Sequence, residues 1–129
     1  MAEPLWLERE LVLLLHEDII AETGGAAGVR DEGLLDSALA RPLNRHAYEG
    51  VTDIVELAAT YAVAIASNHP FIDGNKRSAF MALGLFLEEN GFQLTAEPGD
   101  ATDAMMAVAR GETTIEALAV WLEARVAPA

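Results

Sequence analysis

Apolar residues recur along most of the chain at the spacing of an α-helix. In the first segment they form one stripe with a repeat of about 3.6 residues, at Leu7, Leu11, Leu14, Leu15 and Ile19. We expect this helix to end within 23–25, Thr-Gly-Gly, because glycine is the usual residue just past a helix C-terminus. A loop over 24–29 then leads to a short helix, which Asp31 caps and the Arg-Pro pair at 41–42 ends.

The middle of the chain holds the two most apolar helices. Asp53 and Glu56 have the spacing of a capping box and introduce a helix over 54–67, whose apolar residues go almost all the way round. A second helix is predicted over 75–90, stopped by Gly91, and it too is apolar nearly all round. Helices of this kind are buried on most faces, so we expect the pair to form a central antiparallel hairpin.

The last third of the chain is predicted to add two more helices. Residues 92–95 fit a short strand, for which the sequence identifies no partner. The Pro-Gly pair at 98–99 has turn chemistry, and a helix follows over 100–111. Thr113 and Glu116 form a second capping box for the final helix, which ends near residue 125.

This succession of helices with short connections predicts an all-α fold. The chain has 129 residues, which suits a single domain over 1–129 and leaves little room for a second. A hydrophobic fraction of 52% is enough to bury a core. We therefore expect a compact bundle of five to six helices around the buried hairpin.

Charge and composition exclude several classes of protein. Lysine and arginine total 8 and aspartate and glutamate total 21, so the net charge of −13 argues against direct nucleic-acid binding. The absence of cysteine excludes disulfide frameworks, thiolate metal sites and cysteine nucleophiles. The apolar runs at 11–15 and 79–87 are short and bordered by charged residues, which argues against a membrane span and against a signal segment. We expect a soluble, cytoplasmic protein.

One segment does not have the composition of a packing loop. Residues 69–77, His-Pro-Phe-Ile-Asp-Gly-Asn-Lys-Arg, join the two most apolar helices. Lys76 is the single lysine of the chain and stands beside Arg77 at the predicted first turn of a helix. Cations are unfavourable there, because a helix N-terminus already carries partial positive charge. A departure of this kind usually marks a functional site.

The start of that helix fits a site for a polyphosphate. The main-chain N–H groups of Gly74, Asn75 and Lys76 would point at an incoming anion, and glycine lets a ligand approach the backbone closely. Lys76 and Arg77 would add mobile and bidentate positive charge. The alternative is a solvated pair of cations, and their position at a helix start is what favours a ligand.

Two other side chains of the loop could take part in chemistry. Asp73 beside a phosphate is the usual arrangement for holding Mg²⁺, and His69 at the mouth of the loop can accept a proton near neutral pH. Each also has a structural alternative when taken alone. Asp73 before a glycine is a strong turn signal, and a lone histidine after a helix is more often a cap than a base.

Segment 69–77 closely resembles the signature of the Fic/Doc proteins, His-x-Phe-x-(Asp/Glu)-(Gly/Ala)-Asn-x-(Arg/Lys). Segments 28–42, 47–49, 59–61 and 87–91 are also similar to Doc segments in the same order, so the resemblance covers nearly the whole chain. With lysine at position 76 in place of glycine, the motif resembles that of the Doc (death-on-curing) branch of the family. Members of this branch are the toxins of bacterial type II toxin–antitoxin modules. The resemblance implies an all-helical Fic-type core.

The resemblance also implies an activity, cofactors and partners. Fic enzymes mostly transfer adenylyl to a protein hydroxyl. Doc toxins are similar but transfer the γ-phosphoryl of ATP, with Mg²⁺, to a threonine of elongation factor Tu and thereby stop translation. The expected partners are elongation factor Tu and a cognate Phd-like antitoxin, which would insert a helix or segment into an apolar groove. A protein adenylyltransferase and a non-catalytic Fic-like binding module are the alternatives.

The family motif implies a role for each matching residue. His69 corresponds to the base that takes the hydroxyl proton, and Asp73 to the residue that holds Mg²⁺. Asn75 and Arg77 correspond to contacts with phosphate, and Phe71 to an anchor in the core.

Three features of this sequence depart from the common Fic pattern. Lys76 stands where many Fic motifs have glycine, and Phe80 stands where they have a second arginine. Both changes are what Doc proteins show, and both favour a different placement of the nucleotide phosphates. The self-inhibitory pattern (Ser/Thr)-x-x-x-Glu-(Gly/Asn) is missing from this sequence, so we expect inhibition by a separate antitoxin chain.

Other polar residues are less informative. His16 and the acidic residues at 17–18 do not predict a metal cluster, because adjacent side chains on a helix point away from each other. Four residues near the family's substrate groove could contact nucleotide or target, or could equally lie on the surface: Arg41, Arg45, His46 and Tyr48.

Overall fold

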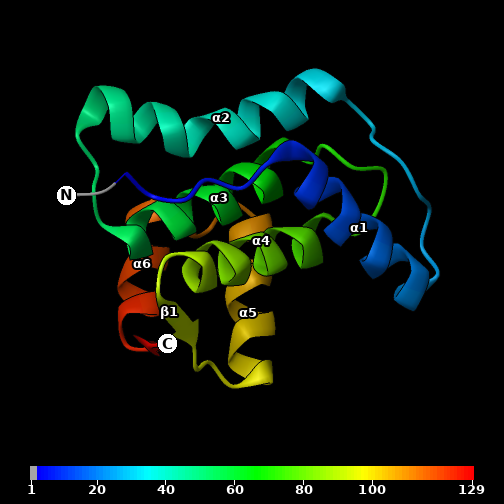
Figure 1. Cartoon of the computed structure of the whole chain (residues 1–129). Coiled ribbons are helices and arrows are strands. Elements are labelled where there is room, and N and C mark those ends of the chain that lie inside the picture. The colour runs from blue at the N-terminus through cyan, green and yellow to red at the C-terminus, as the bar shows by residue number, and fades with distance from the viewer. Residues whose placement is uncertain (1–2) are drawn as a thin grey trace.

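The computed structural model describes residues 3–129, which form six helices and one small sheet (Figure 1). The expected all-α class is confirmed, with a two-stranded addition. None of these helices is both long and apolar enough to cross a membrane. In chain order the elements are α1 (Arg9–Thr23), α2 (Glu32–Glu49), α3 (Ile54–Asn68), α4 (Asn75–Glu89), β1 (Phe92–Leu94), α5 (Pro98–Ala109), α6 (Ile115–Glu123) and β2 (Val126–Pro128).

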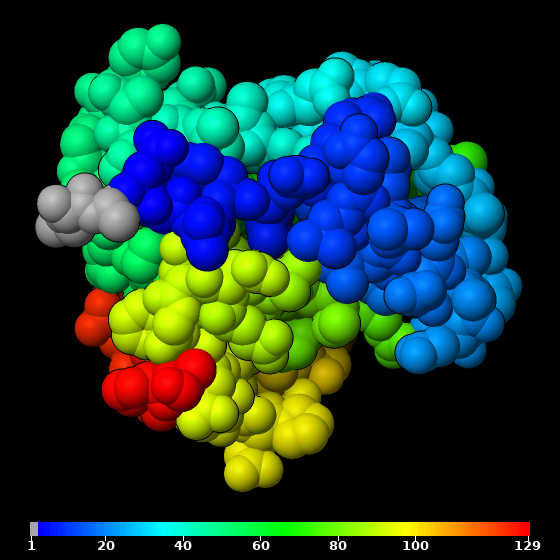
Figure 2. Space-filling model, viewed as in Figure 1, coloured from blue at the N-terminus to red at the C-terminus, as the bar shows by residue number. Residues whose placement is uncertain are grey.

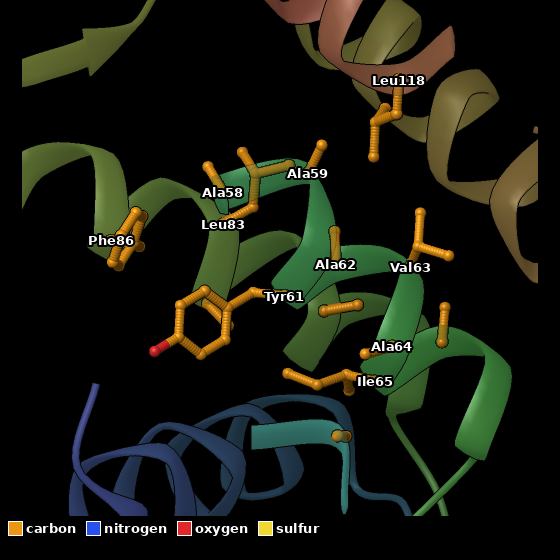
Figure 3. Packing of buried hydrophobic residues seen from close by; sticks show 14 of the residues in the cluster. Ala58, Ala59, Tyr61, Ala62, Val63, Ala64, Ile65, Leu83, Phe86 and Leu118 are labelled. Carbon is orange, nitrogen blue, oxygen red and sulfur yellow. The ribbon is translucent and has the colours of Figure 1, made fainter. Parts of the chain in front are cut away.

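Helix α3 is the centre of the molecule, as its apolar composition predicted. Its residues from Leu57 to Ala66 are all buried, and α2, α4, α5 and α6 pack against it. Alanines on several faces let the neighbouring helices approach closely, while Tyr61 packs beside Phe86 with the ring centroids 5.0 Å apart (Figure 3). Packing from all sides fixes the C-terminal end of α3, where the candidate loop begins.

Helix α4 completes the predicted hairpin, but the expectation that it is apolar and buried nearly all round is wrong. Its buried residues fall on one face, at Asn75, Ser78, Ala79, Ala82, Leu83, Phe86 and Leu87. Met81, on the opposite face, is 42% exposed. The helix is therefore amphipathic, because α3, α1, α5 and β1 pack against it and leave one side in solvent.

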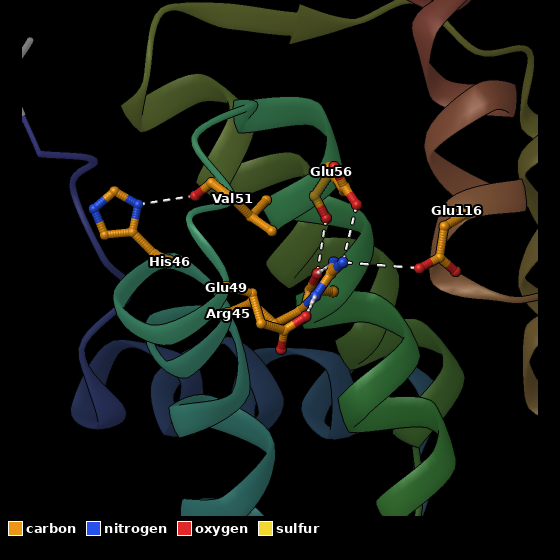
Figure 4. A network of polar contacts seen from close by, with 7 residues as sticks. Arg45, His46, Glu49, Val51, Glu56 and Glu116 are labelled. Atoms are coloured by element: carbon orange, nitrogen blue, oxygen red, sulfur yellow. Dashed lines mark hydrogen bonds and ion pairs between the residues drawn. The ribbon is translucent and has the colours of Figure 1, made fainter.

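Helix α2 continues through Pro42, where the sequence predicted that it would end. Proline removes one helical hydrogen bond, and its ring crowds the carbonyl of the preceding turn. Tertiary contacts beyond the proline offset this cost (Figure 4). Arg45 donates to Thr60 Oγ1 over 2.8 Å and to Glu56 Oε1 over 2.9 Å. Gly50, with φ of 69°, then ends the helix.

Three helix starts differ from the predicted capping pattern. Residues 98–99 form the first turn of α5 and not a separate turn, because the missing N–H of proline is no loss at a first helical position. Thr114, not Thr113, caps α6, since its hydroxyl accepts from the Ala117 N–H over 3.1 Å. Asp53 caps α3 as predicted, but Glu56 pairs with Arg45 and does not close the capping box.

The strand expected after α4 has a partner at the end of the described chain. β1 pairs antiparallel with β2, with Phe92 opposite Pro128 and Leu94 opposite Val126. The sequence could not identify this partner, because Val-Ala-Pro has little of the composition typical of a strand. The pairing holds the segment after α6 against the end of α4.

The segment before α1 lies across the middle of the molecule, between α2 and α4 (Figure 2). The Leu7 N–H donates to the Tyr61 hydroxyl over 3.1 Å, and the Leu5 N–H donates to Asn90 Oδ1 over 2.8 Å. Trp6 stacks on Phe86 with the ring centroids 5.9 Å apart. These contacts bind the N-terminal segment to both helices of the hairpin.

Candidate active site

His69 ends helix α3 in a left-handed conformation. Its φ of 52° and ψ of 54° make it the one non-glycine residue with positive φ among residues 3–129. Such a conformation costs about 1–2 kcal/mol for a residue with a Cβ, so neighbouring contacts must hold it. Arg30 supplies them by donating to the carbonyl oxygens of His69, over 2.8 Å, and Asn68, over 3.0 Å. The imidazole is thereby left exposed at the end of a buried helix.

The loop after His69 is held by the segment that precedes α2. The Arg30 N–H donates to the Pro70 carbonyl over 2.7 Å, and the Ile72 N–H donates to the Gly28 carbonyl over 3.1 Å. Between these bonds Phe71 is fully buried, as expected of a core anchor. The loop therefore has a fixed backbone although its polar side chains face outward.

Asn75 stabilises this loop through both polar atoms of its side chain. Its Oδ1 accepts from the Phe71 N–H and its Nδ2 donates to the Phe71 carbonyl, each over 2.9 Å. The residue is 5% exposed. A contact between Asn75 and a phosphate would therefore come from its main-chain N–H, because the first N–H groups of a helix have no partner within the helix.

Asp73 lies in the turn that leads into α4, with its carboxylate held by main-chain groups. Oδ1 accepts from the Gly74 N–H over 3.0 Å, and Oδ2 accepts from the Ala26 N–H over 3.4 Å. Since an ionised carboxylate can accept about four hydrogen bonds, each oxygen retains a lone pair for a further ligand.

The carboxylate of Asp73 fits a magnesium ion that arrives with phosphates. Asp73 is the one carboxylate among the described residues that line the cleft. Residues 3–129 contain no group of three or more histidine, aspartate or glutamate side chains placed to hold a metal ion. A divalent ion at Asp73 would thus need ligands from a bound phosphate and from water, which is how Mg²⁺ is usually held beside nucleotides.

The residues that the sequence singled out meet in one open cleft of about 930 Å³. Helix α5 provides a largely apolar wall with Met105 and Met106, and Phe80 adds to it from α4. Lys76 and Arg77 are exposed and form no ion pair with any carboxylate of residues 3–129. The cleft brings together all six candidate site residues: His69, Asp73, Gly74, Asn75, Lys76 and Arg77.

Sequence reasoning missed the contribution of His16 on α1. It is 3% exposed, its ring stacks on Phe71 with the centroids 3.8 Å apart, and its Nε2 lies 2.8 Å from the Asp73 carbonyl oxygen. The buried stripe of α1 is at Val12, His16, Ile19 and Ile20, whereas Leu14 is 56% exposed. The helical spacing of these four residues could have identified His16 as buried. A search for apolar residues alone does not find this stripe, because one of its members is a histidine.

The four residues suggested near a substrate groove do not line this cleft. Arg45 is buried among Glu49, Glu56 and Glu116, within 4 Å of all three carboxylates (Figure 4). The His46 ring contacts the Val51 carbonyl over 2.9 Å. Arg41 and Tyr48 are exposed, and Arg41 lines a smaller hollow beside α6. Of the four, Arg45 joins α2 to α3 and α6, and no hydrogen bond or ion pair among residues 3–129 links any of them to the loop at 69–77.

Comparison with known proteins gives consistent matches. Residues 6–87 match the model of the Fic/DOC family. A protein of Escherichia phage P1 described as "Protein kinase doc" is 38% identical over 110 residues, which cover 85% of this chain and 86% of the relative. A "Toxin Doc" of Mycolicibacterium smegmatis is 38% identical over 120 residues, covering 91% of this chain and 90% of that relative.

Proposed function

Because the chain belongs to the Fic/Doc family, we propose that it is a Doc-type toxin that transfers the γ-phosphoryl group of ATP to a hydroxyl of a protein. The observation that carries the proposal is the shared cleft. Among residues 3–129 it places an exposed histidine, one carboxylate and two cations without an ion pair around the start of one helix. A proton acceptor, a carboxylate for Mg²⁺ and cations beside the phosphates are recurring components of enzymes that transfer a phosphoryl group from a nucleotide.

The start of α4 would bind the phosphates of ATP. The helix N-terminus presents the main-chain N–H groups of Asn75 and Lys76, whereas the Gly74 N–H is taken by Asp73, and Lys76 and Arg77 add full positive charges. The charge of −13 over the whole chain makes this local positive region the favourable place for a polyanion. Asp73 would hold Mg²⁺ together with the phosphates, and the ion would neutralise charge on the transferred group.

His69 would act as the general base. Neither of its ring nitrogens takes part in a hydrogen bond within residues 3–129, so the imidazole is free to accept a proton. In the proposed step the substrate hydroxyl oxygen forms a bond to the γ-phosphorus as the bond to the β–γ bridging oxygen breaks. ADP leaves, and the hydroxyl proton passes to His69.

Lys76 and Phe80 favour phosphoryl transfer over adenylyl transfer. A lysine in the first helical turn fills the space that a glycine would leave open and carries its charge further out. Phe80 lines the cleft without a charge. The polyphosphate would then lie with its γ-phosphate toward the base, because the orientation of the nucleotide decides which group is transferred.

The proposed target is a threonine of elongation factor Tu, and the proposed partner is a Phd-like antitoxin. Both are what the resemblance to Doc toxins implies, and the relatives described as a protein kinase and a toxin support a phosphorylated protein and a neutralising partner without naming either. Modification of this factor would stop translation, which accounts for toxicity and for the need of a neutralising chain.

Mass analysis of elongation factor Tu after incubation with the protein, ATP and Mg²⁺ tests the proposal. We expect one added phosphoryl group on a threonine. His69→Ala should lower the rate about 10²–10⁴-fold, since that is the usual contribution of a general base. The histidine is exposed, so its loss leaves the helical circular dichroism unchanged. A folded His69→Ala protein that modifies the factor at the native rate would refute the assignment, and an unmodified factor would leave the binding-module alternative.

A further inference from the structure

Helix α1 and the turn that follows it contact two different parts of Asp73, its main-chain carbonyl and its side-chain carboxylate. His16 Nε2 lies 2.8 Å from the Asp73 carbonyl oxygen. A carbonyl only accepts hydrogen bonds, so this nitrogen carries the proton and donates it. The Ala26 N–H, just past α1, donates to Oδ2 of the same residue over 3.4 Å. Helix α1 therefore contacts the backbone of Asp73, and the turn after it contacts the carboxylate.

The position of His16 is itself fixed by packing. Its ring lies parallel to that of Phe71, with an interplanar angle of 7° and a centroid distance of 3.8 Å. Phe71 is fully buried, and its main chain is bonded on both sides to Asn75. The imidazole is thus clamped against the core of the loop and has little freedom to turn away from Asp73.

Gly25 leaves the space that the carboxylate of Asp73 occupies. A Cβ at position 25 would lie 2.7 Å from Asp73 Oδ2 and 3.1 Å from its Cγ. Real Cβ atoms do not approach so closely, so a side chain here would push the carboxylate away or displace the turn. Gly25 is not among the glycines with positive φ, so the close approach of Asp73, and not backbone freedom, favours glycine at this position.

We propose that His16 and Gly25 are positioning residues, which set the orientation of the Asp73 carboxylate in the cleft. His16 fixes the Asp73 main chain, and Gly25 with the Ala26 N–H fixes the side chain. The effect of this positioning on Mg²⁺ binding rests on the proposed function, because Asp73 is the residue proposed to hold Mg²⁺ with the phosphates of ATP. Groups that orient a metal ligand typically contribute about 10–100-fold to metal affinity or activity.

Three variants separate positioning from packing. His16→Phe keeps a ring against Phe71 but removes the donor, whereas His16→Gln keeps a donor and removes the ring. Gly25→Ala displaces the carboxylate directly. Gly84→Ala is the matched control, because a Cβ at position 84 would meet nothing within 4 Å.

The first measurement needs no nucleotide and is therefore independent of the proposed activity. Both main-chain donors to the carboxylate, Ala26 and Gly74, have amide resonances that report the position of Asp73. We expect the Ala26 resonance to shift in His16→Phe and the Gly74 resonance to shift in Gly25→Ala, because neither amide adjoins the substituted residue. The Ala26 resonance should return toward its native position in His16→Gln, and both should stay unchanged in Gly84→Ala. Native resonances in a folded His16→Phe protein would overturn the inference, whatever the protein transfers.

The second measurement is calorimetric binding of the magnesium complex of a non-hydrolysable ATP analogue, with the Mg²⁺ dependence of phosphoryl transfer beside it. His16→Phe and Gly25→Ala should weaken binding and raise the required Mg²⁺ concentration about 10-fold or more, with His16→Gln recovering most of the loss. Equal losses in His16→Phe and His16→Gln, in step with a lower melting temperature, would show a packing role only and contradict the proposal. If the native protein binds the analogue but transfers nothing, the proposed function fails while the comparison of variants still decides the role of His16.

Discussion

Asn75 shows at the scale of a single residue how a motif can serve structure and chemistry together. The sequence suggested a contact with phosphate, yet both polar atoms of its side chain bond to the main chain of Phe71. Its burial makes those bonds part of the core, where an unpaired main-chain group costs about 1–3 kcal/mol. The residue therefore shapes the loop from which His69 and Asp73 project, and its proposed role at the phosphate is left to its N–H group.

Changing Asn75 to Ala should destabilise the protein by about 2–4 kcal/mol, because it leaves the N–H and carbonyl of Phe71 unpaired. Asn75→Asp retains an acceptor for the N–H but sets a buried carboxylate oxygen against the Phe71 carbonyl, so at neutral pH it should not recover that loss. Urea unfolding of the three proteins measures both differences. An Asn75→Ala protein as stable as the native one would mean that water replaces the side chain and that the loop does not depend on it.

The difference between what sequence could and could not predict at this scale is physical. His69, Asp73, Lys76 and Arg77 were identified because exposed ionisable groups at a helix junction have no packing role to explain them. His16 was missed because a histidine within an apolar stripe is normally part of the core, and only the fold brings it to the Asp73 carbonyl. Contacts between residues distant in the chain are absent from local patterns.

At the scale of elements, the helices were predictable and their limits less so. Periodicity located α1, α3 and α4, since an amphipathic or apolar pattern over many residues outweighs local preferences. The sequence prediction ended α2 too early, at Pro42. The unfavourable effect of proline can be read from the local sequence, whereas the contacts of Arg45 with α3 and α6 that stabilise the rest of the helix are tertiary. The prediction also overestimated the burial of α4, because composition does not tell which sides of a helix neighbours cover.

Arg45 should contribute more to the free energy of unfolding than an arginine in an exposed ion pair does. Its side chain is 11% exposed and bonds to Glu56 and Thr60, so Arg45→Met should cost about 2–3 kcal/mol. Arg9 is the matched control. It pairs with Glu32 and Asp36, but its side chain is 37% exposed, so Arg9→Met should cost about 1 kcal/mol or less. Chemical denaturation compares the two, and equal losses would contradict the view that Arg45 holds α2 beyond its proline.

At the scale of the whole molecule, Tyr61 links the N-terminal segment to the core. It is fully buried on α3, and its hydroxyl accepts from the Leu7 N–H. Burial raises the pKa of Tyr61 to about 12 from its ordinary value of 10.0, although the hydrogen bond from Leu7 lowers it somewhat. The folded protein therefore favours the neutral phenol in a range of pH where the unfolded chain ionises it.

This shift predicts how stability depends on pH. Below pH 10 the phenol is neutral in both states, and between about pH 10 and 12 only the unfolded chain loses the proton. The free energy of unfolding should fall across this window by up to about 1.4 kcal/mol per pH unit. Tyr61→Phe should remove that component, and Tyr48→Phe, at an 84% exposed site, should leave it in place. Parallel pH profiles of native and Tyr61→Phe proteins would contradict the assignment.

The transfer of label from ATP to the protein substrate tests the central claim most directly. The native protein, elongation factor Tu and Mg²⁺ are incubated with ATP labelled either at the γ-phosphate or at the α-phosphate, and the substrate is then assayed for label. We expect label from γ-labelled ATP alone, and weaker transfer by Lys76→Gly, which removes the charge and reopens the space at the start of α4. Label moving from α-labelled ATP would contradict the account, because it would identify the native protein as an adenylyltransferase.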